Sequence, residues 1–129
     1  MSSPTVPGPV PIDPQYVAYW QHLRAAQSVA QGQAYDLAWR EAREIAACLY
    51  RDFGAIRVLV FGSLVRDRFT EDSDIDLAAE GIPPERYFAA VAQANQLSTR
   101  WVDLKPLEAL EPYFRQRVLA TGVDLDATH

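Results

Sequence analysis

The feature that most constrains the fold is a short apolar run at residues 56–61, with the sequence IRVLVF. It is apolar except for Arg57, is rich in valine and isoleucine, and ends at Gly62. A run of this length without polar alternation is typical of a strand covered on both faces. Such a strand needs packing layers on both sides. We therefore expect an α/β (α+β) fold, in which helices pack on a small mixed sheet.

Periodicity places the other elements around this strand. Apolar residues recur at helical spacing over residues 16–30 and 33–53, and Gly32 lies between them, which predicts two N-terminal helices. Further helices are expected over 84–97, with Phe88 facing inward, and over 107–121, with Gly122 as the stop. Further strands are expected over 74–79 and 100–104, with one or two helical turns at 64–68 and a polar turn at 70–73.

The chain of 129 residues fits one domain. Residues 1–14 hold five of the nine prolines, so we expect a disordered or extended tail there and a single domain over 15–129. Within that domain, residues 15–53 form the N-terminal helices and 54–122 the core. Cys48 is the only cysteine and cannot form an internal disulfide, and we expect it to be a buried, inert thiol.

Net charge and hydropathy argue against nucleic acid and membranes as binding partners. The net charge is −5 and no run of basic residues occurs, so stable nucleic-acid binding is not expected. No apolar run approaches the roughly 20 residues that span a bilayer. The N-terminus also lacks the charged start and apolar stretch of a signal peptide. We expect a cytoplasmic protein that does not enter the membrane.

Three aspartates indicate a metal site. Asp74 and Asp76 project from the same face of the second predicted strand, because side chains alternate along a strand. Two adjacent carboxylates in a half-buried site repel each other, and a divalent cation removes that conflict. Asp103 on the next predicted strand can complete the cluster. Oxygen ligands without histidine or cysteine favour Mg²⁺, or Mn²⁺ as a substitute, over zinc.

Gly62 and Ser63 indicate a phosphate site. Glycine at the end of a buried strand lets the backbone approach a ligand closely, and the amides of a following helical turn favour phosphate. A phosphate cradle facing a carboxylate cluster is the minimum for two-metal nucleotidyl transfer. Each residue also has a structural reading, in which Asp74 caps the turn, Asp76 is a solvated strand residue and Ser63 is a helix N-cap.

The segment GSLVRDRFTEDSDIDL resembles the GS-x10-DxD signature of the DNA polymerase β nucleotidyltransferase superfamily. More narrowly, it resembles the minimal nucleotidyltransferase (MNT) antitoxins that pair with HEPN-domain toxins. The resemblance covers residues 54–122 and includes the VDL at 102–104. It implies a polymerase β-like core with two bound Mg²⁺ ions and ATP as substrate.

The resemblance also implies residue roles. Gly62 and Ser63 match the phosphate-binding turn, Asp74 and Asp76 the metal-binding pair, and Asp103 the third carboxylate, which ligates the catalytic metal and helps to activate the nucleophile. Three further positions are less settled. Arg66 matches an arginine common in the GSxxRG form and binds nucleotide or forms a surface ion pair. Asp67 replaces the usual glycine of that form. Lys105 replaces an apolar residue and contacts phosphate or solvent.

The implied activity is transfer of AMP from ATP to a tyrosine of the toxin, which silences its RNase site. Two alternatives stay open: an antitoxin that only masks its toxin, and a small-molecule transferase of the aminoglycoside-modifying type. The aromatics of the N-terminal helices belong either to the core or to a surface for the toxin or a second copy: Trp20, Tyr35, Trp39 and Tyr50. The sequence shows no adenine-reading motif and does not fix the oligomeric state.

Overall fold

The computed structural model describes residues 14–66 and 68–126. The elements follow in the order α1 (Pro14–Phe53), β1 (Arg57–Phe61), a 3-10 turn (Gly62–Leu64), β2 (Ile75–Glu80), a 3-10 turn (Pro84–Arg86), α2 (Tyr87–Gln96), β3 (Val102–Pro106), a 3-10 turn (Leu107–Ala109), α3 (Pro112–Thr121) and β4 (Val123–Leu125). The expected α+β class with a small mixed sheet is confirmed. Of the tail expected at 1–14, residues 1–13 lie outside the described residues, and Pro14 belongs to α1.

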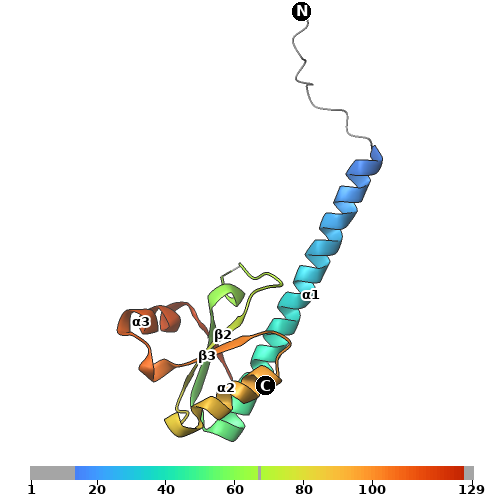
Figure 1. Cartoon of the computed structure of the whole chain (residues 1–129). Helices are drawn as coiled ribbons and strands as arrows, with labels where there is room; N and C mark the ends of the chain where they lie inside the picture. Colours follow the sequence, from blue (N-terminus) through green and yellow to red (C-terminus); the bar gives the residue numbers. More distant parts are fainter. Residues whose placement is uncertain (1–13, 67, 127–129) are drawn as a thin grey trace, which may run out of the picture. The chain divides into compact units, whose positions relative to one another are not determined.

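The sheet has the strand order β3-β2-β1-β4. β1 pairs antiparallel with β2 and β4, whereas β2 and β3 are parallel. The larger core lies between the sheet and the helices α2 and 33–53 of α1, and a smaller one lies beneath α3. Figure 1 shows α2 and the second half of α1 on one face of the sheet and α3 on the other. The central strand β1 is therefore covered on both faces, as its apolar sequence predicts.

The two predicted N-terminal helices are one continuous helix, and this expectation was wrong. Gly32 lies within α1, and an added Cβ there would meet no atom within 4 Å. One glycine costs a helix only about 1 kcal/mol, and the flanking alanines and glutamines favour helix on both sides. The residues of α1 nonetheless fall into two units at Gly32, and among the side chains of α1 that the structure describes, the buried ones all lie in the unit that begins at Gln33.

The second half of α1 packs as its period predicts. The stripe expected to face inward is buried from Ala38 onward, and Ala34 packs against its edge: Ala38, Ala42, Ile45, Leu49 and Phe53. Cys48 is buried, as expected, and burial raises the pKa of its thiol above the ordinary value. A thiol held protonated in this way is a weak nucleophile.

The other two predicted helices are each shorter than expected. Pro84 begins a 3-10 turn rather than α2, and Phe88 is 85% exposed instead of inward, while Ala90 and Ala94 fill the interior. The last helix begins at Pro112, because Leu110 is extended and Glu111 caps the new N-terminus. The Glu111 carboxylate accepts hydrogen bonds from the amides of Tyr113 and Phe114, both at 3.0 Å.

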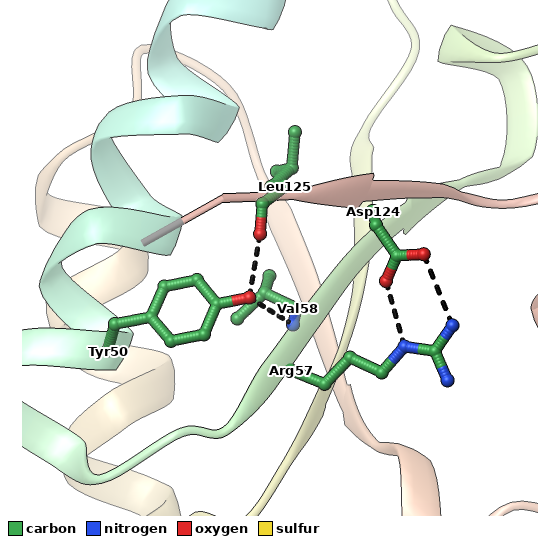
Figure 2. Close-up of polar contacts among 5 residues, drawn as sticks. All are labelled: Tyr50, Arg57, Val58, Asp124 and Leu125. Carbon is green, nitrogen blue, oxygen red and sulfur yellow. Dashed lines mark hydrogen bonds and ion pairs between the residues drawn. The ribbon is translucent and has the colours of Figure 1, made fainter. Parts of the chain in front are cut away.

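β4 was not expected from the sequence, because a segment of three residues carries almost no period. Figure 2 shows what fixes it. The Tyr50 hydroxyl donates to the carbonyl of Leu125 at 2.6 Å and accepts from the amide of Val58 at 2.9 Å. Arg57 and Asp124 form a two-pronged ion pair at 2.8 and 3.1 Å across the same strand pair. Tyr50 thus ties α1 to both β1 and β4.

No helix in the described part of the chain has the length and apolar character needed to cross a bilayer.

Candidate active site

The end of β1 forms a tight turn against Asp76. Gly62 has φ +77°, a left-handed conformation that favours glycine. A Cβ at this position would lie 2.2 Å from Oδ2 of Asp76, so a side chain here would displace the carboxylate. The amide of Val65 donates to the carbonyl of Gly62 at 3.1 Å and closes a single 3-10 turn, where the sequence predicted up to two helical turns. The first amides of such a turn have no partner within it, so they can donate to a ligand.

Strand register brings the key carboxylates together. Asp76 pairs with Phe61 of β1 on one side and with Asp103 of β3 on the other. The neighbours of Asp76 along β2, Ile75 and Leu77, are buried in the larger core, so Asp76 projects from the opposite face. Because β2 and β3 are parallel and β1 is antiparallel to them, the start of β2, the start of β3 and the end of β1 meet at one edge of the sheet.

Asp74 lies just before β2 at the end of a loop braced by Arg100. The amide of Thr70 donates to Oγ of Ser73 at 2.9 Å, and the amide of Ser73 donates back to the carbonyl of Thr70 at 3.0 Å. The Arg100 guanidinium donates to the carbonyl of Ser73 at 2.6 Å and stacks over Phe69. The segment before β3 therefore holds the loop that carries Asp74. Arg100 was not predicted from the sequence, since no local pattern marks a contact between distant loops.

Electrostatics single out Asp76. Its pKa is raised to about 6, mainly because burial disfavours the charged form and further because Asp103 and Asp74 repel a negative charge there. Lys105 acts in the opposite direction. A cation bound near Asp76 would therefore stabilise the charged form of this half-buried carboxylate.

Lys105 supplies a cation to the neighbouring carboxylate. Its ammonium lies 3.0 and 3.2 Å from the two oxygens of Asp103. From the sequence, Lys105 was expected to contact phosphate or solvent, and the structure shows an ion pair instead. Tyr87 lies near the same carboxylate. Its hydroxyl donates to the carbonyl of Leu104, and burial, followed by Asp103, raises its pKa above the ordinary value.

The donor set fits a hard divalent cation, although the side chains do not converge on one point. Among residues 14–66 and 68–126, no three histidine, cysteine, aspartate or glutamate side chains form a group that would hold a metal ion. Asp74 is exposed and Asp103 is engaged by Lys105. The backbone register that places Asp76 beside Asp103 does not depend on these rotamers, and oxygen donors of this kind suit Mg²⁺.

The remaining predicted residues, Ser63 and Arg66, lie in or just after the turn that follows β1. Ser63 is half-buried within the 3-10 turn. Arg66 is exposed, and its amide donates to the carbonyl of Ser63 at 3.3 Å. The structure therefore joins Arg66 to the turn through its backbone and places its guanidinium at the surface. Asp67 lies outside the described residues.

This arrangement of strands and carboxylates defines a nucleotidyltransferase core. The nucleotidyltransferase domain family matches residues 42–125, and the chain belongs to this family. Within it, the chain is similar to a structure described as a minimal nucleotidyltransferase. The two are 31% identical with a TM-score of 0.57, over 66% of this chain and 90% of that chain. The resemblance to minimal nucleotidyltransferases expected from the sequence is confirmed.

Two more distant structures share the fold. One is a toxin-antitoxin with AMP-PNP, at 21% identity and a TM-score of 0.56, over 69% of this chain and 74% of that chain. The other is the toxin-antitoxin MntA-HepT, at 20% identity and a TM-score of 0.50, over 68% and 70%. No curated protein sequence matches this chain.

Proposed function

We propose that this chain is a magnesium-dependent nucleotidyltransferase that moves AMP from cytoplasmic ATP to a hydroxyl of a HEPN-domain toxin and thereby silences it. The observation that carries the proposal is the three-strand juxtaposition at one edge of the sheet. Asp76 lies between Phe61, which leads into the Gly62 turn, and Asp103. Its neighbours supply both parts that nucleotidyl transfer requires, a phosphate-binding backbone and a carboxylate cluster.

Each predicted site residue has a role in the proposed reaction that follows from its position. The amides of the Gly62–Leu64 turn and the Ser63 hydroxyl bind the triphosphate. Asp74, Asp76 and Asp103 hold Mg²⁺, which supplies charge neutralisation for the phosphates and the leaving pyrophosphate. The acceptor oxygen bonds to the α-phosphorus of ATP as the bond to the β-phosphate oxygen breaks, and the acceptor proton passes to Asp103. Arg66 stands at the rim, where an exposed guanidinium can reach a nucleotide phosphate.

The toxin as acceptor is supported by two features. Two structures that share this fold are toxin-antitoxin complexes, one of them with an ATP analogue. In addition, the first half of α1 exposes large apolar side chains, including Tyr19, Trp20 and Val29, which suits a partner-binding helix. The aromatics of α1 thus divide. Trp20 and Tyr35 are exposed, whereas Trp39 and Tyr50 pack against the larger core.

The test is transfer of label from ATP carrying ³²P at the α-phosphate to a purified HEPN-domain toxin in the presence of Mg²⁺. We expect labelled toxin with the wild-type chain and none with Asp74→Asn or Asp76→Asn. Full labelling by both variants would contradict the mechanism. Label transferred to an aminoglycoside and not to protein would instead identify a small-molecule transferase. Competition by GTP, CTP and UTP establishes the base preference.

A masking antitoxin predicts a different result. If a variant with all three aspartates changed to asparagine still neutralises the toxin fully, binding alone is sufficient and the transfer step is not the source of silencing. The exposed side chains of residues 14–32 would bind the toxin in such a masking antitoxin. Substitution of Tyr19 and Trp20 by serine should therefore abolish neutralisation.

A further inference from the structure

Lys105 is the only lysine in the chain, which carries 11 arginines among its 12 basic residues. This one ammonium group lies in the candidate active site, at 3.0 and 3.2 Å from both oxygens of Asp103. The side chain of Lys105 is 37% exposed and that of Asp103 is 39% exposed, so the pair lies at the border between interior and solvent. A lysine carries a compact charge on a flexible stem, whereas a guanidinium would grip both carboxylate oxygens in a fixed fork.

The strand geometry places Lys105 and Asp103 on the same face of the sheet. Asp103 and Lys105 are two positions apart on β3, so their side chains project from the same face of the sheet. In the register with β2, Asp103 lies beside Asp76 and Lys105 lies beside Ala78. Ala78 is fully buried and small. The ammonium therefore shares a sheet face with Asp76 and Asp103, the face from which any metal must be bound.

We propose that Lys105 is an internal counter-ion for Asp103 that a divalent metal must displace, so that metal and ammonium compete for one carboxylate. The inference rests on the proposed function, in which Asp76 and Asp103 bind Mg²⁺. Both oxygens of Asp103 face the ammonium of Lys105, and binding of a metal by Asp103 requires at least one of them. Lys105 consequently weakens the binding of free metal and keeps the carboxylate pair compatible with the folded sheet when metal is absent.

The first experiment measures Mn²⁺ binding without nucleotide, from the electron paramagnetic resonance signal of free Mn²⁺. We expect Lys105→Met, which keeps the length of the stem and removes the charge, to bind Mn²⁺ about fivefold more tightly than the wild type, as the loss of a partly exposed ion pair implies. In an Asp103→Asn background, the same lysine substitution should change the affinity little, because the competing pair is already gone.

Equal or weaker Mn²⁺ binding by Lys105→Met overturns the counter-ion role alone. Absence of Mn²⁺ binding in both the wild type and Lys105→Met overturns the proposed metal site, and the role of Lys105 with it. A Lys105→Arg variant separates charge from stem length. It keeps the cation and should bind Mn²⁺ no more tightly than the wild type, whereas an increase equal to that of Lys105→Met would show that charge is not the cause.

A second experiment uses the wild-type sequence and so does not depend on the folding of a variant. Reductive methylation with ¹³C-formaldehyde keeps the charge and labels only Lys105 and the terminal amine. We expect the Lys105 methyl resonance to shift during Mg²⁺ titration, with the same midpoint as metal binding measured by calorimetry. A resonance that stays fixed while Mg²⁺ binds would overturn displacement of the ammonium.

Discussion

Gly62 and Asp76 are in such close contact that a single methyl group at Gly62 would lie 2.2 Å from the carboxylate oxygen. The contact joins the turn after β1 to the first residues of β2, and these two segments supply the phosphate-binding and metal-binding halves of the proposed site. The glycine thus serves two needs at once, a positive φ and a close approach to a functional side chain.

Gly62→Ala should abolish nucleotidyl transfer because it displaces Asp76. Gly54→Ala is the matched control, since Gly54 also has φ +77° but an added Cβ there would meet no atom within 4 Å. We expect both variants to lose about 1 kcal/mol of stability from the strained backbone, with a further loss only at Gly62. Thermal unfolding and the labelled-ATP assay measure the two effects. An active Gly62→Ala enzyme would show that the contact is not needed.

The pH dependence of metal-free stability should report Asp76. Its folded-state pKa of about 6 lies above the ordinary carboxyl value, so the stability it contributes is fully present at low pH and is lost as pH rises through about 6. In EDTA at pH 7, Asp76→Asn should therefore unfold at a higher temperature than the wild type, and the difference should vanish near pH 4. Asp72→Asn, at an exposed loop position, is the control. A lower melting temperature for Asp76→Asn at pH 7 would contradict this account.

Arg100 should affect activity through Asp74 without touching the substrate. Arg100→Gln removes the hydrogen bond to the carbonyl of Ser73 and the stacking on Phe69, so the loop before β2 should lose order. We expect a loss of about 1–2 kcal/mol in stability and a weaker affinity for Mg²⁺. Arg51→Gln, which removes only an exposed pair with its neighbour Asp52, should change neither quantity. Unchanged Mg²⁺ affinity in Arg100→Gln would separate the loop from the metal site.

Tyr50→Phe should destabilise the sheet and leave the chemistry intact. The substitution leaves the amide of Val58 and the carbonyl of Leu125 without their hydroxyl partner, which costs about 1–3 kcal/mol. Urea denaturation measures the loss. Tyr113→Phe, at a site 67% exposed, should lose almost nothing. Equal stability of the two variants would mean that Tyr50 does not anchor β4.

Local patterns in the sequence predicted the parts of the fold that depend on local physics. The apolar run at 56–61 predicted a strand covered on both faces, and the period of residues 33–53 predicted which side chains of α1 are buried. The GS-x10-DxD spacing selected a turn and a strand that the structure places in contact, at Gly62 and Asp76.

The missed features depend on contacts between distant segments. β4 forms because Tyr50 and β1 hold it, and Arg100 matters because it reaches the loop that precedes β2. The ion pair of Lys105 could have been found, since positions 103 and 105 of one strand share a face. Gly32 was predicted to interrupt the helix, but the helix continues through it because strong helix-forming residues flank it.

Metal-dependent nucleotide binding at Asp76 can be measured by calorimetric titration of the wild type and Asp76→Asn with a non-hydrolysable ATP analogue, with and without Mg²⁺. We expect the wild type to bind the analogue only when Mg²⁺ is present, and we expect Asp76→Asn to lose that binding. Binding of equal affinity in both proteins, or in the absence of Mg²⁺, would contradict a metal-dependent nucleotide site built on Asp76.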